Sequence, residues 1–337
     1  MPRVIKKPKP KPKAFGQTTP GSSPPSSSPT STTVAGMKSV ISGREIPKDL
    51  QGVSGMRSGF VIPTVNQIRM VITGQPGAGK STLLNSNPTV LSLDPERGGD
   101  TAADPQALRF TPPPDTDPMV LDQAYLTFVD SIIARKMRGA TDIGMICLDT
   151  IDEFIDIFLT ALCLRKGVDD PIDLKDGSGN GYTIVRKAIF GMLDKVHRAG
   201  MGWAIIAHTR TKTVRIGGEE RQVSGLSVSD SFKGAIFQKC EHMLFVEHGV
   251  EQVKGPEEVK VVGGKKIKKP GKVSTQKVRK LKTRPGGLWQ GGDTNDVKVR
   301  VPITDELILP KVGGWDLFTK AYEDACSTLT QETKNDV

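Results

Sequence analysis

The stretch Gly74-Gln75-Pro76-Gly77-Ala78-Gly79-Lys80-Ser81-Thr82 fits every fixed position of the phosphate-binding pattern G-x-x-x-x-G-K-[ST]. The apolar, β-branched run at residues 68–73 predicts a buried strand before it, and residues 80–85 can begin a helix. Glycines allow consecutive backbone N–H groups to surround an anion, and a helix N-terminus adds about half a positive charge. We therefore expect residues 74–82 to bind the phosphates of a nucleoside triphosphate. Lys80 would reach the β- and γ-phosphates, and the Ser81 hydroxyl would ligate Mg²⁺.

Composition limits the compartments in which such a chain functions. The 337 residues are 36% hydrophobic, and the shortfall lies mainly in the first forty. The four cysteines have no C-x-x-C spacing, which argues against a disulfide framework and favours a reducing compartment. No apolar run is long enough to span a membrane, and the basic N-terminus lacks the apolar segment of a secretory signal. We expect a cytoplasmic protein without a membrane partner.

The net charge of +10 is distributed unevenly. Residues 1–13 contain six basic residues and no acid, and residues 254–284 contain twelve basic residues against two glutamates. The rest of the chain is therefore net acidic. Two basic segments beside an acidic core suggest a polyanionic partner in addition to the nucleotide. For residues 1–13 alone, a role in solubility explains the charge as well as DNA binding does.

Changes in composition divide the chain into five segments. Residues 1–36 are rich in Lys-Pro and then in Ser, Pro and Thr, which predicts a disordered arm. We expect a connecting segment at 37–65, the core at 66–253, a basic β-rich extension completing the core at 254–325, and a flexible tail at 326–337.

Strands and helices alternate through the predicted core. Apolar runs predict further strands at residues 89–93, 143–148 and 202–207, and helical spacing of apolar residues predicts helices at 119–138, 151–166 and 182–198. This alternation predicts an α/β fold with a mostly parallel central sheet and helices on both faces. Phosphate chemistry then belongs at the carboxyl ends of the strands.

The pattern changes after His208. Residues 209–229 are polar and contain glycine, which predicts a long loop, and residues 241–246 predict another strand. Residues 254–284 alternate basic and β-branched residues, which is consistent with either a β-hairpin or a mobile basic loop. Beyond Trp315 we expect a short helix and a frayed polar tail at 328–337.

Four polar residues are candidates for nucleotide chemistry. Asp149 follows the strand at 143–148 and would hold Mg²⁺ through water, although it also precedes a helix and is placed to cap it. Glu96 follows the strand at 89–93 and is the preferred residue for positioning water, with Glu153 as the alternative. His208 follows the strand at 202–207 and is placed to sense the γ-phosphate. Together with Lys80 and Glu96, it completes the set of candidate catalytic residues.

A family resemblance rests on four segments in order: residues 74–82, Leu93-Asp94-Pro95-Glu96-Arg97-Gly98-Gly99, Leu148-Asp149-Thr150-Ile151-Asp152-Glu153, and Ala207-His208-Thr209-Arg210. Together they resemble phage nucleotide-binding ATPases of the RecA-like P-loop class, AAA-type ATP-binding proteins that include Sak-type single-strand annealing proteins. The resemblance covers about residues 66–310. It implies a RecA-like fold with ATP as the nucleotide and Glu96 activating water. It also implies that His208 couples the nucleotide to a DNA-binding loop at residues 211–229.

The expected partners follow from charge and from this resemblance. The predicted loop carries Lys212, Arg215 and Arg221 but no aromatic residue to stack on bases. Further DNA-binding candidates lie in the basic extension: Lys265, Lys266, Lys268 and Lys269. Lys282 and Arg284 are candidates for sensing ATP in a neighbouring subunit.

The sequence thus suggests a Mg²⁺-dependent, DNA-stimulated ATPase that binds single-stranded DNA in phage recombination, annealing or replication. It would act as a homo-oligomeric ring or filament, together with a single-strand binding protein or other phage recombination proteins. Three alternatives stay open: a helicase or packaging motor, a small-molecule (nucleotide) kinase, and a non-hydrolysing, ATP-gated DNA-binding factor. Residues 167–181 contain only Lys175 as a basic residue, which makes them a poor lid for a kinase.

Overall fold

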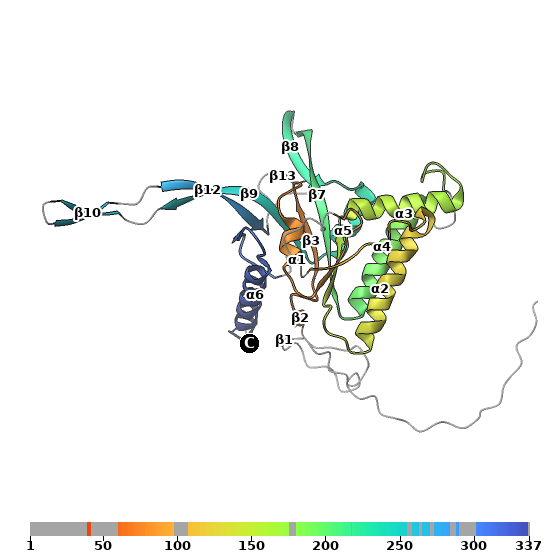
Figure 1. Cartoon of the computed structure of the whole chain (residues 1–337), viewed down its shortest axis with the longest axis horizontal. Helices are drawn as coiled ribbons and strands as arrows, with labels where there is room; N and C mark the ends of the chain where they lie inside the picture. Colours follow the sequence, from red (N-terminus) through yellow and green to blue (C-terminus); the bar gives the residue numbers. More distant parts are fainter. Residues whose placement is uncertain are drawn as a thin grey trace, which may run out of the picture. The chain divides into compact units, whose positions relative to one another are not determined.

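The apolar runs predicted as strands lie side by side in one central sheet (Figure 1). Its strand order is β14 (Glu306–Leu309), β12 (Val273–Lys282), β9 (His242–Lys254), β3 (Arg69–Gly74), β7 (Gly202–Ile216), β6 (Met145–Asp149), β4 (Val90–Leu93) and β5 (Leu108–Phe110). The strands from β9 to β5 are parallel to their neighbours, whereas β12 and β14 are antiparallel. The prediction of a mostly parallel sheet is confirmed.

The computed structural model describes residues 39–41, 60–97, 107–174, 180–216, 218–254, 258–262, 265–269, 273–283, 288–289 and 301–335. The predicted N-terminal arm at 1–36 and the candidate Arg284 lie outside these residues. Residues Gly36–Val337 form one unit, so the basic extension is not a domain separate from the predicted core. Near the start of this unit, the short strands β1 (Ser39–Ile41) and β2 (Phe60–Ile62) pair antiparallel.

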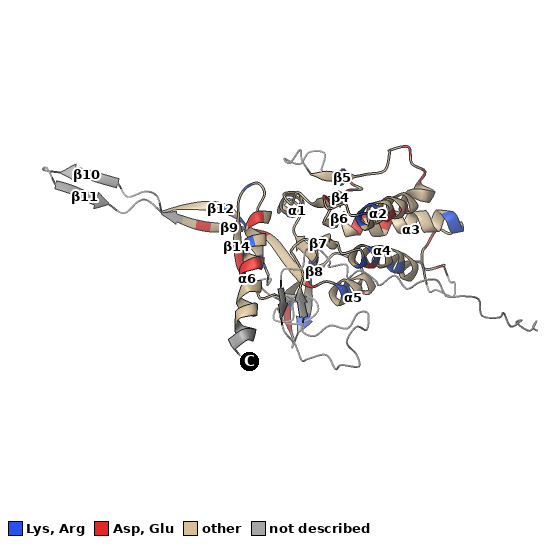
Figure 2. Cartoon of the chain, turned by 90° about the horizontal axis from the view of Figure 1, so that it is seen from below, with Lys and Arg blue, Asp and Glu red and all other residues tan. Residues whose placement is uncertain are grey.

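Helices cover both faces of the sheet, as predicted (Figures 1 and 2). One face packs against α2 (Leu121–Met137), α3 (Ile151–Lys166), α4 (Gly181–Arg198) and α5 (Asp230–Lys239). The other packs against α1 (Lys80–Asn85) and α6 (Trp315–Asn335). Successive residues of β3 alternate between the two cores, with Val71 in the first and Met70 and Ile72 in the second. The strand is thus buried on both sides, which explains its uninterrupted apolar sequence.

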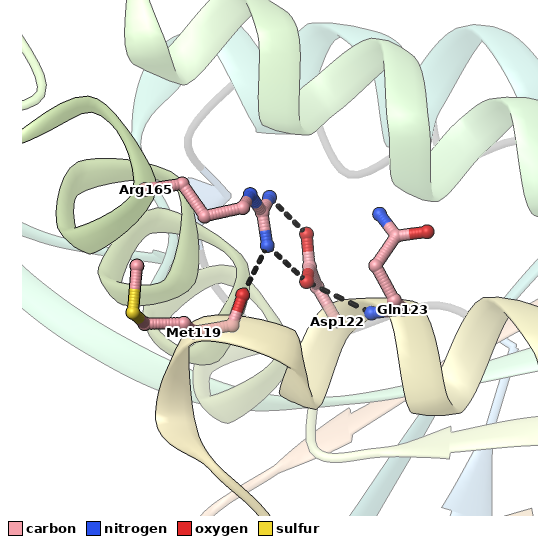
Figure 3. Close-up of polar contacts among 4 residues, drawn as sticks. All are labelled: Met119, Asp122, Gln123 and Arg165. Carbon is pink, nitrogen blue, oxygen red and sulfur yellow. Dashed lines mark hydrogen bonds and ion pairs between the residues drawn. The ribbon is translucent and has the colours of Figure 1, made fainter.

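A partly buried ion pair joins the first turn of α2 to the last turn of α3 (Figure 3). The Arg165 guanidinium donates to both carboxylate oxygens of Asp122 at 2.6 Å, and it also donates to the Met119 carbonyl oxygen in the 3-10 turn η3 (Pro118–Val120). Asp122 is 4% exposed. Because α3 follows β6 directly, this contact helps to fix the helix that begins at the candidate site.

The prediction of a long loop at residues 209–229 is wrong. Strand β7 continues to Ile216 and returns as β8 (Glu219–Leu226), and the two form an antiparallel hairpin that extends beyond the end of β3 (Figure 1). A short strand, β13 (Leu288–Trp289), pairs in parallel with β8. The segment is therefore an ordered β-hairpin, which presents its basic residues at fixed spacing.

The described residues between 254 and 283 take the first of the two predicted forms, a β-hairpin. Strands β9 and β12 pair from Phe245 with Lys282 to Lys254 with Val273, and β10 (Glu258–Val262) pairs with β11 (Lys265–Lys269) further along the chain. Strand β3 pairs with β9 only as far as Phe245, and β14 pairs with β12 only from Arg279 onward. Residues 249–254 of β9 and 273–278 of β12 therefore continue past their other neighbours in the sheet, and residues 249–278 are here called the arm.

The C-terminal segment is more ordered than predicted. Helix α6 continues to Asn335, through the residues expected to form a frayed tail. Its residues Trp315, Phe318 and Tyr322 are buried against the sheet, and this packing supports the helix. Among the residues that the structure describes, no helix combines the length and apolar character needed to cross a bilayer.

Candidate functional site

The phosphate loop begins where β3 ends, at the carboxyl edge of the sheet. Gly74, Gly77 and Gly79 have φ values of 153°, 76° and 90°, which favour glycine. At Gly74 a side chain is also excluded by space, since a Cβ atom would lie 2.1 Å from the Val246 carbonyl oxygen of β9. Helix α1 has only six residues, so phosphate binding would depend more on the N–H groups of the loop than on a helix dipole.

Lys80 is buried at the mouth of this loop. Its Nζ atom donates to the carbonyl oxygens of Gly74 at 3.1 Å and Gln75 at 3.0 Å, and it lies 3.5 Å from His208 Nδ1. Burial lowers the pKa of Lys80, whereas the nearby carboxylates, Asp149 first among them, raise it. The lysine therefore lies among the acidic candidates, as expected for a residue that binds phosphate beside Mg²⁺.

His208 reaches the loop because β7 is the immediate neighbour of β3. Gly74 and His208 are paired in the parallel register, and one residue further Thr209 hydrogen-bonds the Thr73 hydroxyl at 2.9 Å. The structure thus places His208 beside Lys80, where a γ-phosphate sensor is expected.

Asp149 ends β6, the strand next to β7, and is 9% exposed. Its peptide bond to Thr150 is cis. Burial raises the pKa of the Asp149 carboxyl to about 6, and the nearby carboxylates of Asp94 and Glu96 raise it as well, whereas a hydrogen bond with Ser81 and the charge of Lys80 lower it.

The two residues predicted to serve Mg²⁺ are therefore in contact. Because Ser81 bonds Asp149 and other carboxylates crowd around them, a divalent cation fits this position. Within the described ranges no three His, Cys, Asp or Glu side chains are arranged to hold a metal by themselves. Ser81 and Asp149 would thus share the cation with nucleotide oxygens and water, and its charge would offset that of the phosphates.

Glu96 and Glu153 lie on the same side of the site. Glu96 is exposed just beyond β4 and accepts a hydrogen bond from the Thr150 hydroxyl at 3.1 Å. Burial raises the pKa of Glu153, and the Glu96 carboxylate raises it further. The fold brings both candidate bases to the carboxyl edge, so either is positioned to orient water.

Asp152 is an acidic residue that the sequence reasoning did not single out. The His208 backbone N–H hydrogen-bonds its carboxylate, whose Oδ2 atom is buried without a hydrogen-bond partner in the described part of the chain. A cavity of about 390 Å³ opens here, lined by Asp152, Ile155, Asp156, Leu159, Tyr182, His208, Ser227, Val228 and Ser229. The available signal is its position, because Asp152 lies in the first turn of α3, three residues after Asp149 at the end of β6.

Two further residues reach the phosphate loop from the distant β9–β12 hairpin. His248 Nε2 lies 3.3 Å from the Gly77 carbonyl oxygen, and Arg279 donates to the Gly79 carbonyl oxygen at 3.3 Å. They are 171 and 200 residues away from these glycines in the sequence. These two residues could be predicted only from the strand pairing, which sets Arg279 opposite His248.

The candidate DNA-binding residues belong to strands other than the one that leads into the phosphate loop. Lys212, Arg215 and Arg221 are exposed on the β7–β8 hairpin, where Arg215 and Arg221 form ion pairs with Glu220 and Glu219. Lys265, Lys266, Lys268 and Lys269 belong to β11 within the arm. The structure thus divides these candidates between two hairpins.

Lys282, one of the two candidates for action in trans, is bound within its own chain. Its Nζ atom forms ion pairs with Glu247 at 2.5 Å and Glu306 at 3.8 Å. These ion pairs join Lys282 to β9 and β14, the strands on either side of β12.

Comparison with known families gives a match that spans the candidate site. Residues 66–293 match a family model described as an AAA domain. The match spans more than half of the chain and includes the phosphate loop, Glu96, Asp149 and His208. No curated protein matches the sequence.

Proposed function

The chain belongs to the AAA domain family of nucleotide-binding ATPases, and on that premise we propose that it hydrolyses Mg-ATP in a cycle coupled to single-stranded DNA. The observation that carries the hydrolytic part is the meeting of side chains from four parallel strands at one edge of the sheet. Lys80 follows β3, His208 lies within β7, Asp149 ends β6, and Glu96 follows β4. This is the carboxyl edge, where α/β sheets bind their ligands.

Each side chain has a defined part in this proposal. Lys80 and the loop N–H groups bind the phosphates, and Ser81 and Asp149 hold the cation. Glu96 orients the attacking water, with Glu153 as the alternative residue for this step. Mg²⁺ supplies charge stabilisation at the phosphates, while the protein fixes their position and excludes competing geometries.

The DNA-binding part rests on two basic hairpins. The arm contains eight lysines and three glutamates, and the β7–β8 hairpin begins directly beyond His208. Backbone pairing brings Trp289 of β13 opposite Ser224 of β8, which supplies the hairpin with a neighbouring aromatic residue. Basic residues for phosphates and an aromatic residue for stacking are what single-stranded DNA requires.

Tryptophan fluorescence tests this part directly. Of the three tryptophans, Trp203 and Trp315 are buried in the cores, so a change on adding a dT oligonucleotide would report mainly on Trp289. We expect quenching in the wild type that is absent in Trp289→Phe, and an ATP-dependent affinity that falls steeply with salt. If the oligonucleotide does not bind at low salt, with or without ATP, the DNA-binding part is contradicted. The proposal of nucleotide binding is not affected by that result.

We further propose that the protein acts as a homo-oligomer in phage DNA recombination, annealing or replication, as the resemblance to Sak-type proteins suggests. A basic residue of one subunit would then reach ATP bound to the next. Arg284 is the better candidate, since Lys282 is paired within its own chain. Unchanged single-turnover hydrolysis in Arg284→Ala and Lys282→Ala would refute this step.

A second candidate function, that of a small-molecule kinase, is favoured by the cavity beside His208. The Oδ2 atom of Asp152, which is buried and has no hydrogen-bond partner among the described residues, would suit the hydroxyl group of a phosphate acceptor. Incubation with γ-labelled ATP and a panel of nucleosides and nucleotides distinguishes the kinase from the ATPase. Phosphate transfer that is lost in Asp152→Asn would select the kinase, whereas release of free phosphate alone would select the ATPase.

The remaining alternatives share the nucleotide site and differ in what ATP does. ATP-driven strand displacement or DNA packaging would identify a motor. Nucleotide-dependent DNA affinity without turnover would identify a gated binding factor.

A further inference from the structure

Arg279 lies in β12 at the base of the arm and bonds to main-chain carbonyl oxygens. Its Nε and Nη2 atoms donate to the Pro310 carbonyl oxygen at 3.1 Å and 2.7 Å. Nη2 also donates to Gly313 at 2.8 Å, and Nη1 donates to Gly79 at 3.3 Å. One guanidinium group thus joins the phosphate loop to the segment that leads from β14 into α6.

The positive charge of Arg279 has no carboxylate partner within the described ranges. Its neighbours on β12 differ, since Lys280 is paired with Glu306 and Lys282 with Glu247. Burial lowers the pKa of Arg279, yet a guanidinium remains protonated in proteins. An uncompensated cation in contact with the phosphate loop favours the binding of an anion there.

The contact with Gly79 also fixes the direction of a phosphate-binding group. The Gly79 carbonyl oxygen accepts from Leu83 N–H in α1 and from Arg279, so the plane of the Gly79–Lys80 peptide is held from two sides. In a planar trans peptide, the N–H group points opposite to the carbonyl. The Lys80 N–H is therefore directed away from Arg279, toward the interior of the loop.

Space around the contact is tight. A Cβ atom built on Gly79 would lie 2.3 Å from Arg279 Nη1. On the opposite strand, His248 is paired with Arg279 and approaches Gly77, the preceding glycine of the loop with positive φ. The base of the arm therefore forms one wall of the phosphate loop.

We propose that Arg279 is a positioning residue for the phosphates, acting within its own subunit. Its guanidinium holds the Gly79–Lys80 peptide in the phosphate-binding orientation and places a positive charge behind the loop. The inference rests on the proposed nucleotide binding, and it is separate from the role in trans considered for Lys282 and Arg284.

The test is nucleotide affinity in the full-length protein, measured with Mg²⁺ and a fluorescent ADP or non-hydrolysable ATP analogue. We expect Arg279→Ala to weaken the affinity by about tenfold or more, because charge-assisted hydrogen bonds and a cation are both lost. The affinity of Arg279→Lys should lie between those of the wild type and Arg279→Ala, since an ammonium group keeps the charge but cannot span three carbonyl oxygens. Lys280→Ala is the matched control on the same strand and should stay within about twofold of the wild type.

Thermal unfolding without ligand separates positioning from a general loss of structure. A folded Arg279→Ala variant that binds both analogues as tightly as the wild type would overturn the proposal, even if its unfolding temperature fell. If Arg279→Ala does not fold, Arg279→Gln decides by the same criterion, because its amide still donates to a carbonyl oxygen. If the wild type itself binds neither analogue, the proposed function fails first and the inference fails with it.

Discussion

At the scale of single residues, Asp149 shows how a site suited to a cation lowers the stability of the metal-free fold. Burial raises the pKa of this carboxyl from 3.8 to about 6, so the folded, metal-free protein binds the proton more tightly than the unfolded chain does. The resulting stability is fully present below pH 3.8 and is lost as the pH rises through about 6. Near neutral pH the buried carboxylate therefore destabilises the metal-free fold.

We predict that Asp149→Asn is more stable than the wild type at pH 7.5 without Mg²⁺ or nucleotide. The free energy of unfolding in urea should rise by about 1–2 kcal/mol, and the difference should shrink toward pH 4. Adding Mg²⁺ and a nucleotide should reverse the order, because only the wild type retains the carboxylate for the cation. A difference that does not depend on pH would contradict this interpretation of Asp149.

The residues that the sequence could predict lie at the end of an apolar run or within three residues of it. Asp149, His208 and Glu96 each come at the end of an apolar run, and parallel strands bring their carboxyl ends to one edge. Arg279 and His248 carry no such signal. They reach the loop only because β9 pairs with β3 and β12 pairs with β9. Such long-range strand pairing cannot be inferred from local composition.

At the scale of elements, the Arg165–Asp122 ion pair is the clearest contact that fixes the position of α3. Two parallel hydrogen bonds and the low exposure of Asp122 make it stronger than an ordinary surface pair. Removing Asp122 would leave a partly buried guanidinium without its partner.

Asp122→Ala should therefore lower the free energy of unfolding by about 2–3 kcal/mol, measured by urea denaturation. Asp142→Ala provides the control, since the Arg135–Asp142 pair is about half exposed and its loss should cost no more than about 0.5 kcal/mol. Nucleotide affinity should be unchanged in both variants. Equal losses of stability in the two would show that burial does not strengthen the Arg165–Asp122 pair.

The errors in element prediction have a common cause. Residues 209–226 are mostly exposed in a two-stranded hairpin, so they show no alternation of buried and exposed residues that would mark strands. The polar sequence at the end of α6 predicts a tail, although Tyr322 is buried and Cys326 and Leu329 pack against the same core at helical spacing. In both cases the decisive contacts do not show in local composition: strand pairing forms the hairpin, and packing against the core supports the end of α6.

At the scale of the whole molecule, the nucleotide site and the tip of the arm are separable, because the arm leaves the sheet beyond Arg279 and His248. Lys254 and Val273 are paired across β9 and β12, so an Asn-Gly turn between them can replace residues 255–272. This deletion removes six lysines and two glutamates.

We predict that the shortened protein binds nucleotide within about twofold of the wild type but binds single-stranded DNA less tightly. The slope of log affinity against log salt concentration should decrease, because fewer counterions are released from the DNA. Fluorescence anisotropy of a labelled dT oligonucleotide at several salt concentrations measures this slope. An unchanged slope would show that the six lysines removed with residues 255–272 do not contact the DNA.

The most direct test of the proposed function is the steady-state rate of ATP hydrolysis with and without single-stranded DNA. It should be measured in the wild type, Lys80→Ala and Glu96→Gln, with Glu153→Gln as the comparison for the choice of base. We predict Mg²⁺-dependent hydrolysis that DNA accelerates in the wild type. Lys80→Ala should lose nucleotide binding, and Glu96→Gln should bind ATP but hydrolyse it about 100-fold more slowly. Wild-type turnover that DNA does not change and that Lys80→Ala retains would contradict a DNA-coupled ATPase at this phosphate loop.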